Sequence, residues 1–327
     1  MKKIIAGVLV SALFIYLSIK GTDFRGVMTG LEVIGYVYIL PFLLISLLMQ
    51  ILRSWRWGLI ISPLGKIGPL PLFAITSVGF LAVTALPARL GELGRPYLLS
   101  RNSPIKMSAA LGTIFVERIL DGVTILTIAL IVPFFTPLPA WLIRASIFFL
   151  LANGLLITGV YCAVFRRQQL LDFLNFFLRR LPEKWSQLLA QLLGHFLDGF
   201  RIIGNGKQLL QILALSLLIW LVNALAIYTL FTAFAFSLPP VAALVLMIIL
   251  LIGIAIPTAP GFIGNWHFSC VLGLSLFGIA KTPALTFALI YHFAAVSFTL
   301  FLGVVSFPYL NFSFSDLWKE AKSTLTS

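Results

Sequence analysis

Residues 241–280 read VAALVLMIILLIGIAIPTAPGFIGNWHFSCVLGLSLFGIA, and this stretch decides what kind of fold the chain can have. Pro257, Pro260, Gly261 and Gly264 interrupt an otherwise apolar segment, and each apolar arm is shorter than the ~20 residues that a membrane-spanning helix needs. Non-helical backbone at membrane depth is tolerated only where protein or a watery cavity covers it. We therefore predict a re-entrant helical hairpin whose break lines a cavity.

The composition of the whole chain agrees with a membrane protein. Of 327 residues, 60% are hydrophobic and 10% are charged, whereas soluble domains carry about 25% charged residues. We expect a single all-α transmembrane domain over residues 1–327, with about seven spanning helices of ~20 residues each and no soluble domain. The first segment, after Lys2 and Lys3, is predicted to be an uncleaved helix. Besides 241–280, the apolar segments are Ile4 to Ile19, Val33 to Leu52, Ile67 to Leu86, Met107 to Phe135, Trp141 to Val164, Leu209 to Phe236 and Pro283 to Phe307.

The basic residues predict the sidedness, because Lys and Arg accumulate on the cytoplasmic side. If residues 67–95 form a first re-entrant segment that enters from the cytoplasm, nearly all basic residues, including those of the loop 166–207, lie inside. The segment 241–280 then enters from the outside. We expect a multi-pass protein of the cytoplasmic (inner) membrane with both termini in the cytoplasm. The basic residues left outside or within a span are Lys20, Arg25, Arg118, Arg144 and Lys281.

The two unusual segments share a pattern of small residues. Each break follows an apolar arm and has a proline followed by two glycines at the same spacing. Because the two segments are predicted to enter from opposite sides, they indicate an inverted repeat, in which paired broken helices build a substrate site at the bilayer midplane. The matched patterns are Pro87-x3-Gly91-x2-Gly94 and Pro257-x3-Gly261-x2-Gly264.

Charged residues follow the first break at helical spacing. Arg89, Glu92 and Arg95 would share one helix face. One interpretation is an anchor at the level of the headgroups. The other is that Arg89 and Arg95 bind a lipid phosphate through their guanidinium groups, while Glu92 orients them or meets a cationic headgroup.

A second charged cluster interrupts the segment that begins at Met107. Glu117 lies about 15 Å along a continuous helix, and ionisable groups at that depth are costly and usually functional. The alternative is that the span starts only after Asp121. Glu117, Arg118 and Asp121 together carry one uncompensated negative charge, which we expect to be neutralised by a proton, by Arg89 or Arg95, or by a cationic headgroup.

The remaining polar residues allow two interpretations each. His267 and His292 lie in apolar segments, where a histidine is a helix contact or a functional group, and His195 is expected at the surface. Residues 53–57 (RSWRW) are predicted to anchor the end of the second span at the interface. Residues 166–207 are predicted to include an amphipathic helix on the anionic cytoplasmic leaflet. The net charge of +13 then reflects membrane orientation and requires no nucleic acid.

Four blocks of the sequence, in this order, resemble the membrane domain of the lysylphosphatidylglycerol synthase family, often called flippase-like. The resemblance covers nearly the whole chain and implies a polytopic fold with re-entrant helices. In some members it implies movement of an aminoacylated phospholipid between leaflets, and others accompany glycolipid or hopanoid pathways. The four blocks are 53–57 (RSWRW), 87–95 (PARLGELGR), 117–121 (ERILD) and 257–264 (PTAPGFIG).

The sequence departs from this family in two ways. The synthase carries a soluble aminoacyl-transferase domain, and this chain ends at Ser327 without one, so we do not expect it to synthesise the lipid alone. Many members place a glutamate where this chain has His267, although a histidine can titrate near neutral pH.

The leading hypothesis is a lipid transporter that shelters a phospholipid, an aminoacyl-lipid or a lipid-linked glycan between the two broken hairpins. The alternatives are a membrane subunit for a separate cytoplasmic transferase and an intramembrane enzyme. No complete catalytic motif is present, so we do not expect an enzyme. Cys162 and Cys270 are far apart and have no metal-ligand spacing, and we expect neither a metal nor another cofactor.

The topology can be tested at Asn102 and Gln187, which we predict to lie on the same, cytoplasmic side because of the distribution of basic residues. Single cysteines at these positions, in a background without Cys162 and Cys270, should react with an impermeant thiol reagent only after the cells are opened. Labelling of either position in intact cells would contradict the re-entrant topology.

Overall fold

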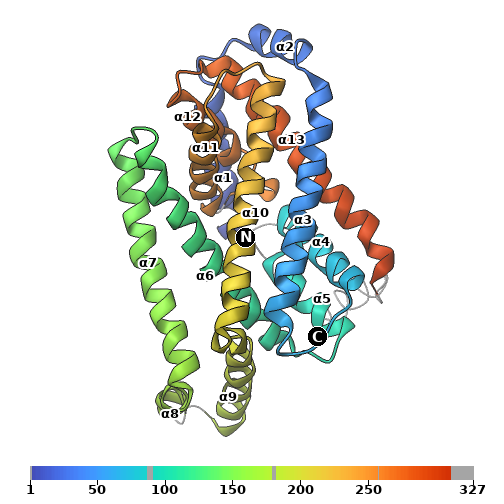
Figure 1. Cartoon of the computed structure of the whole chain (residues 1–327), viewed down its shortest axis with the longest axis vertical. Coiled ribbons are helices and arrows are strands. Elements are labelled where there is room, and N and C mark those ends of the chain that lie inside the picture. The colour runs from blue at the N-terminus through green and yellow to red at the C-terminus, as the bar shows by residue number, and fades with distance from the viewer. Residues whose placement is uncertain (1, 87–90, 179–181, 257, 311–327) are drawn as a thin grey trace.

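The structure is a computed structural model that describes residues 2–86, 91–178, 182–256 and 258–310. This part of the chain is helical throughout and contains no β-strand, which confirms the all-α class (Figure 1). The helices are α1 (Lys2–Ile19), α2 (Phe24–Glu32), α3 (Ile39–Ile61), α4 (Pro69–Ala85), α5 (Gly94–Asn102), α6 (Met107–Ile131), α7 (Ala140–Phe165), α8 (Arg167–Leu178), α9 (Glu183–Asp198), α10 (Gly206–Ala233), α11 (Pro240–Ala255), α12 (Asn265–Ser275) and α13 (Lys281–Ser306).

Long apolar helices make this a multi-pass membrane protein. Four segments of the described chain can span a bilayer by length and composition, and the bent pair α1 and α2, at 82°, allows up to five. Helix α6 has 25 residues, but three charged side chains interrupt its apolar sequence. The four segments are Tyr36–Ile61, Ala140–Cys162, Gly206–Ala233 and Lys281–Tyr309.

The two predicted broken segments form pairs of shorter helices. Helix α4 ends before the first break and packs against α5, while α11 ends before the second break and packs against α12. In Figure 1 the α4 and α5 pair occupies the lower half of the molecule, and the α11 and α12 pair occupies the upper half. Pro87, Arg89 and Pro257 lie outside the described residues.

The basic loop 166–207 contains the helices α8 and α9 and a short 3-10 helix, η4 (Arg201–Gly204). Both α8 and α9 expose large apolar side chains, among them Phe173 and Trp185. The C-terminal part of α9 packs against α6 instead of lying apart from the bundle, because Phe196 and Phe200 stack around Phe115.

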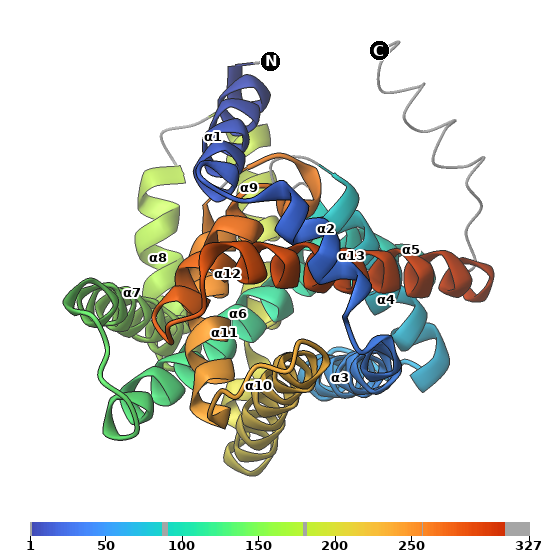
Figure 2. The ribbon, with the colours of Figure 1, turned by 90° about the horizontal axis from the view of Figure 1, so that it is seen from above.

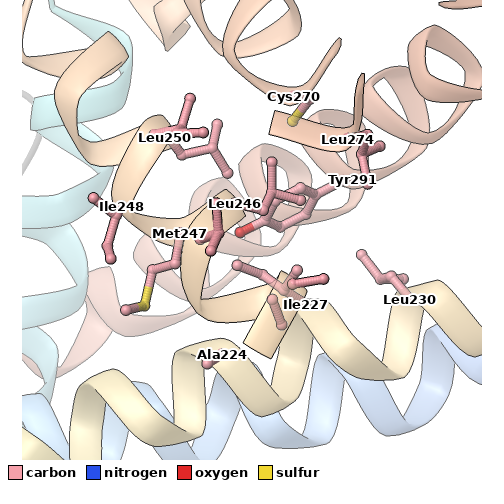
Figure 3. Close-up of a cluster of buried hydrophobic side chains, with 14 of the residues drawn as sticks. Ala224, Ile227, Leu230, Leu246, Met247, Ile248, Leu250, Cys270, Leu274 and Tyr291 are labelled. Atoms are coloured by element: carbon pink, nitrogen blue, oxygen red, sulfur yellow. The ribbon is translucent and has the colours of Figure 1, made fainter. Parts of the chain in front are cut away.

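Two apolar cores lie along the same three helices. One core gathers side chains from α10 to α13, as Figure 3 shows for Ile227, Leu246 and Tyr291. The other gathers side chains from α3, α4, α6 and α9, with the fully buried Trp57 among them. Helices α3, α6 and α10 contribute to both cores, and their buried polar side chains lie between the two sets. Figure 2 shows α10 and α3 side by side, in agreement with their extensive contact.

Helices α6 and α9 approach so closely that only glycine fits between them. A Cβ added at Gly112 would lie 2.1 Å from the Phe196 carbonyl oxygen, and one added at Gly199 would lie 2.5 Å from the Ala109 carbonyl oxygen. Backbone atoms cannot move aside without shifting a helix, so these two glycines determine how α9 docks.

We predict that Gly112→Ala lowers the free energy of unfolding by about 1–3 kcal/mol, the usual cost of overpacking. Gly154→Ala on α7 is the matched control, because a Cβ there meets no atom within 4 Å. Thermal unfolding of the purified variants in detergent measures the difference. Equal melting temperatures for the two variants would show that α9 does not dock as described.

Candidate functional site

A buried ion-pair network connects α3, α6 and α10. Arg56, on α3, donates from Nη1 to the Asp121 carboxylate at 2.5 Å and to the Ser216 hydroxyl at 2.8 Å. Its Nη2 lies 3.4 Å from Glu117 Oε1. Trp220 donates its indole N–H to Asp121 at 3.2 Å. Arg56 is only 2% exposed, so its charge depends on these partners in place of water.

Arg95 attaches the first break to this network. Its two terminal nitrogens donate to the two oxygens of Glu117 at 3.0 and 2.9 Å, in the bidentate geometry that suits a guanidinium and a carboxylate. The guanidinium also lies 5.0 Å from the centroid of the Trp57 ring and 5.1 Å from that of Phe80. Gly79 makes room for the Arg95 side chain, since a Cβ at Gly79 would lie 2.1 Å from Arg95 Cγ.

Arg118 completes the network and differs from the other two arginines in its exposure. It donates to Glu117 at 2.7 Å and lies 3.7 Å from Asp121. Its side chain is 48% exposed although Glu117 is 2% exposed. Arg118 therefore has part of its side chain exposed and lines the cavity, while Arg56 and Arg95 are buried.

Arginines of two other helices neutralise the excess negative charge that the sequence predicts for Glu117, Arg118 and Asp121. Arg95 is one of the expected partners of Glu117, but Arg56 is not, because the apolar segment predicts that α3 ends near Leu52. Helix α3 continues to Ile61, so Arg56 and Trp57 are buried inside the fold and the interfacial-anchor interpretation is wrong for both. Three arginines against two carboxylates leave the network with one net positive charge. Helix α6 is continuous through the cluster.

A cavity of about 290 Å³ adjoins the network. Side chains of α3, α4, α10, α11 and α13 form most of its wall, which is largely apolar. The charged side chains of its described lining are Arg53, Glu92 and Arg118. Both breaks contribute to the wall, because Glu92 belongs to the first and Phe262 lies in the second, within η5 (Pro260–Phe262).

The backbone of the first break is in contact with α4. A Cβ at Gly91 would lie 2.1 Å from the Ala82 carbonyl carbon, and one at Gly94 would lie 3.2 Å from Ala82 Cβ. Only a residue without a side chain fits at Gly91. Glu92, the next residue, is placed at the cavity, and its carboxylate is one of the charges close to Arg118.

The second break is held by hydrogen bonds to its backbone. His292 Nε2 lies 2.6 Å from the Gly261 carbonyl oxygen, and the Gly264 N–H donates to His267 Nδ1 at 3.4 Å. The two histidine rings are 4.7 Å apart, and neither is among the described residues that line the cavity. Ser11 of α1 accepts a hydrogen bond from the Ala259 N–H at 2.8 Å.

The glycines of this break adopt left-handed backbone conformations, with φ of +72° at Gly261 and +98° at Gly264. Such values are strained for residues that carry a Cβ. Pro260 begins the short helix η5, which contains Gly261. Among the described residues, no group of three or more His, Cys, Asp or Glu side chains is arranged to hold a metal ion.

Comparisons with known proteins agree with this architecture. Residues 4–303 match the family described as the lysylphosphatidylglycerol synthase transmembrane region. The chain belongs to this family. A relative, a UPF0104 membrane protein of Methanothermobacter thermautotrophicus, is 27% identical over 249 residues, which cover 70% of this chain and 72% of the relative. No solved structure matches the chain. The family match spans both breaks and the ion-pair network.

We predict that Arg56→Leu lowers the free energy of unfolding by about 3–5 kcal/mol, because the buried Asp121 then keeps only the Trp220 hydrogen bond and Arg118 at 3.7 Å. Arg144→Leu on α7 is the control, since Arg144 is exposed and donates only to its own helix. Chemical unfolding in detergent micelles gives both values. A loss no larger than that of the control would show that Arg56 does not stabilise the fold.

Proposed function

We propose that this protein moves a polar lipid between the leaflets of the membrane by sheltering the headgroup in the cavity between the two breaks. The observation that carries this proposal is a cavity with charged residues on part of its wall, inside a protein whose outer surface is apolar. Ionisable groups inside a membrane protein are costly and mark the pathways of substrates or ions. A polar headgroup is the part of a lipid that cannot cross hydrocarbon unaided.

The size of the cavity supports a headgroup as its occupant. A volume of about 290 Å³ lies at the small end of the ~300–1,000 Å³ that small-molecule sites occupy. Two acyl chains do not fit there together with a headgroup. In our proposal the chains stay outside in the bilayer, against helices with many exposed apolar side chains, such as α7.

The arrangement of the two helix pairs supports alternating access. The breaks lie on one cavity, while their helix pairs extend toward opposite ends of the molecule (Figure 1). We propose that they form an inverted repeat of re-entrant hairpins, entering from the cytoplasmic and the outer side of the inner membrane. The helices α1, α3, α6, α7, α10 and α13 then cross the membrane, and both termini lie in the cytoplasm.

This function predicts that Gly91 and Gly261 in the two breaks cannot be replaced by a residue with a side chain. Gly91→Val would drive a side chain into the backbone of α4, and Gly261→Val would strain a residue with a φ of +72°. Each variant should reduce lipid movement at least about tenfold, since displacing groups that position a substrate commonly costs that much or more. A leaflet-resolved assay with labelled lipids in liposomes measures the rate.

Gly159→Val on α7 is the control, because a side chain there meets no atom within 4 Å. Insertion of all three variants is checked by their yield and elution as folded protein. Normal lipid movement by a folded Gly91 or Gly261 variant would show that its break is only a helix end. No lipid movement by the unmodified protein would refute the proposed function.

A further inference from the structure

Arg53 has a position that the ion-pair network does not explain. It lies on α3 one turn before Arg56, lines the cavity, and has its guanidinium 5.1 Å from the centroid of the Phe80 ring. Within the described part of the chain, no carboxylate oxygen lies within 4.0 Å of it and no hydrogen bond to it is formed. An arginine that is left without a carboxylate in such a place is available to a ligand.

The neighbouring arginines are already engaged. Arg56 and Arg95 are buried and form ion pairs with carboxylates. Arg118 lies within ion-pair distance of both Glu117 and Asp121. Helix α3 holds Arg53 close to this group, whose arginines repel it and whose more distant carboxylates attract it. An anion in the cavity would add an opposite charge at close range, and opposite charges within ~4–6 Å favour the charged form of each other.

The balance of charge on the cavity wall is positive. Arg53 and Arg118 carry two positive charges and Glu92 carries one negative charge, which leaves one positive charge on the described lining. The buried charges behind this wall cancel. Two arginines, Arg56 and Arg95, balance two carboxylates, Glu117 and Asp121. A cationic occupant would therefore meet repulsion, whereas a singly charged anion would be balanced.

We propose that Arg53 binds the phosphate of an anionic lipid headgroup, one that carries no ammonium group to balance its own charge. A guanidinium donates two parallel hydrogen bonds to phosphate oxygens and is more easily desolvated than an ammonium, which suits an apolar cavity. This inference names the substrate class for the function proposed above and rests on it.

Equilibrium binding tests the inference without a transport step. The purified protein in detergent is titrated with phosphatidic acid or with phosphatidylcholine of the same acyl chains, and tryptophan fluorescence reports occupancy because Trp220 and Trp266 line the cavity. We expect tighter binding of phosphatidic acid. Arg53→Gln should weaken it about tenfold or more, the effect of losing charged hydrogen bonds, and should reduce the preference for phosphatidic acid over phosphatidylcholine.

Four further measurements make the outcome decisive. Arg53→Lys should recover part of the affinity because it restores the charge, and Arg144→Gln, on the exposed surface, should have no effect. Thermal unfolding shows whether each variant is folded. Glycerol 3-phosphate should bind weakly, because it lacks acyl chains; equal affinity for it would identify a soluble phosphate in place of a lipid and would overturn the proposal.

Equal binding of both lipids, or unchanged binding of phosphatidic acid by folded Arg53→Gln, would also overturn the inference. Failure of the proposed function gives a different result. Selective binding that depends on Arg53, together with no lipid movement in liposomes, would retain the anion site and reject the transporter.

Discussion

The pairing of Glu117 and Asp121 with arginines of other helices is the constraint on which the rest of the structure depends. Two carboxylates in the middle of α6 are too costly to bury alone, and the helix has only Arg118 to offer them. Arg56 and Arg95 must therefore come to them from α3 and α5. Because these bonds are directional, they fix both the rotation of α3 and the place of α5, which apolar packing alone would leave less strictly defined.

This constraint positions the first break and the cavity. Helix α5 is short and apolar contacts hold only part of it, so the bidentate bond between Arg95 and Glu117 keeps it against α6. Glu92 precedes α5 and is thereby held at the cavity wall. Helix α3, oriented by Arg56, carries Arg53 to the same wall one turn away. The network thus places the residues of the candidate site, and Arg118 and Trp220 belong to both.

The helical class and the places of both breaks can be predicted from the sequence, because proline and glycine within an apolar segment rarely allow a helix to continue. Glu117, Arg118 and Asp121 are also identified correctly as a cluster on one helix. Arg56 is missed because a basic residue near an aromatic one is typical of a helix end at the interface. Its partner Asp121 is 65 residues away and Ser216 is 160 residues away, and no local pattern reveals such contacts. The positive sign of the cluster therefore cannot be derived from α6 alone.

The two breaks are held by interactions of different chemistry. Ion pairs hold the first, and removing a partner from a buried pair costs about 3–5 kcal/mol. Neutral contacts hold the second, among them the bonds of His292 to Gly261, of Ser11 to Ala259 and of Asn265 to the Gly253 and Ile256 carbonyl oxygens, each contributing about 0.5–1.5 kcal/mol. Several such bonds together are comparable to one buried ion pair. The first break is therefore held by charge and the second by a set of neutral hydrogen bonds, and in the function proposed above the headgroup would meet both.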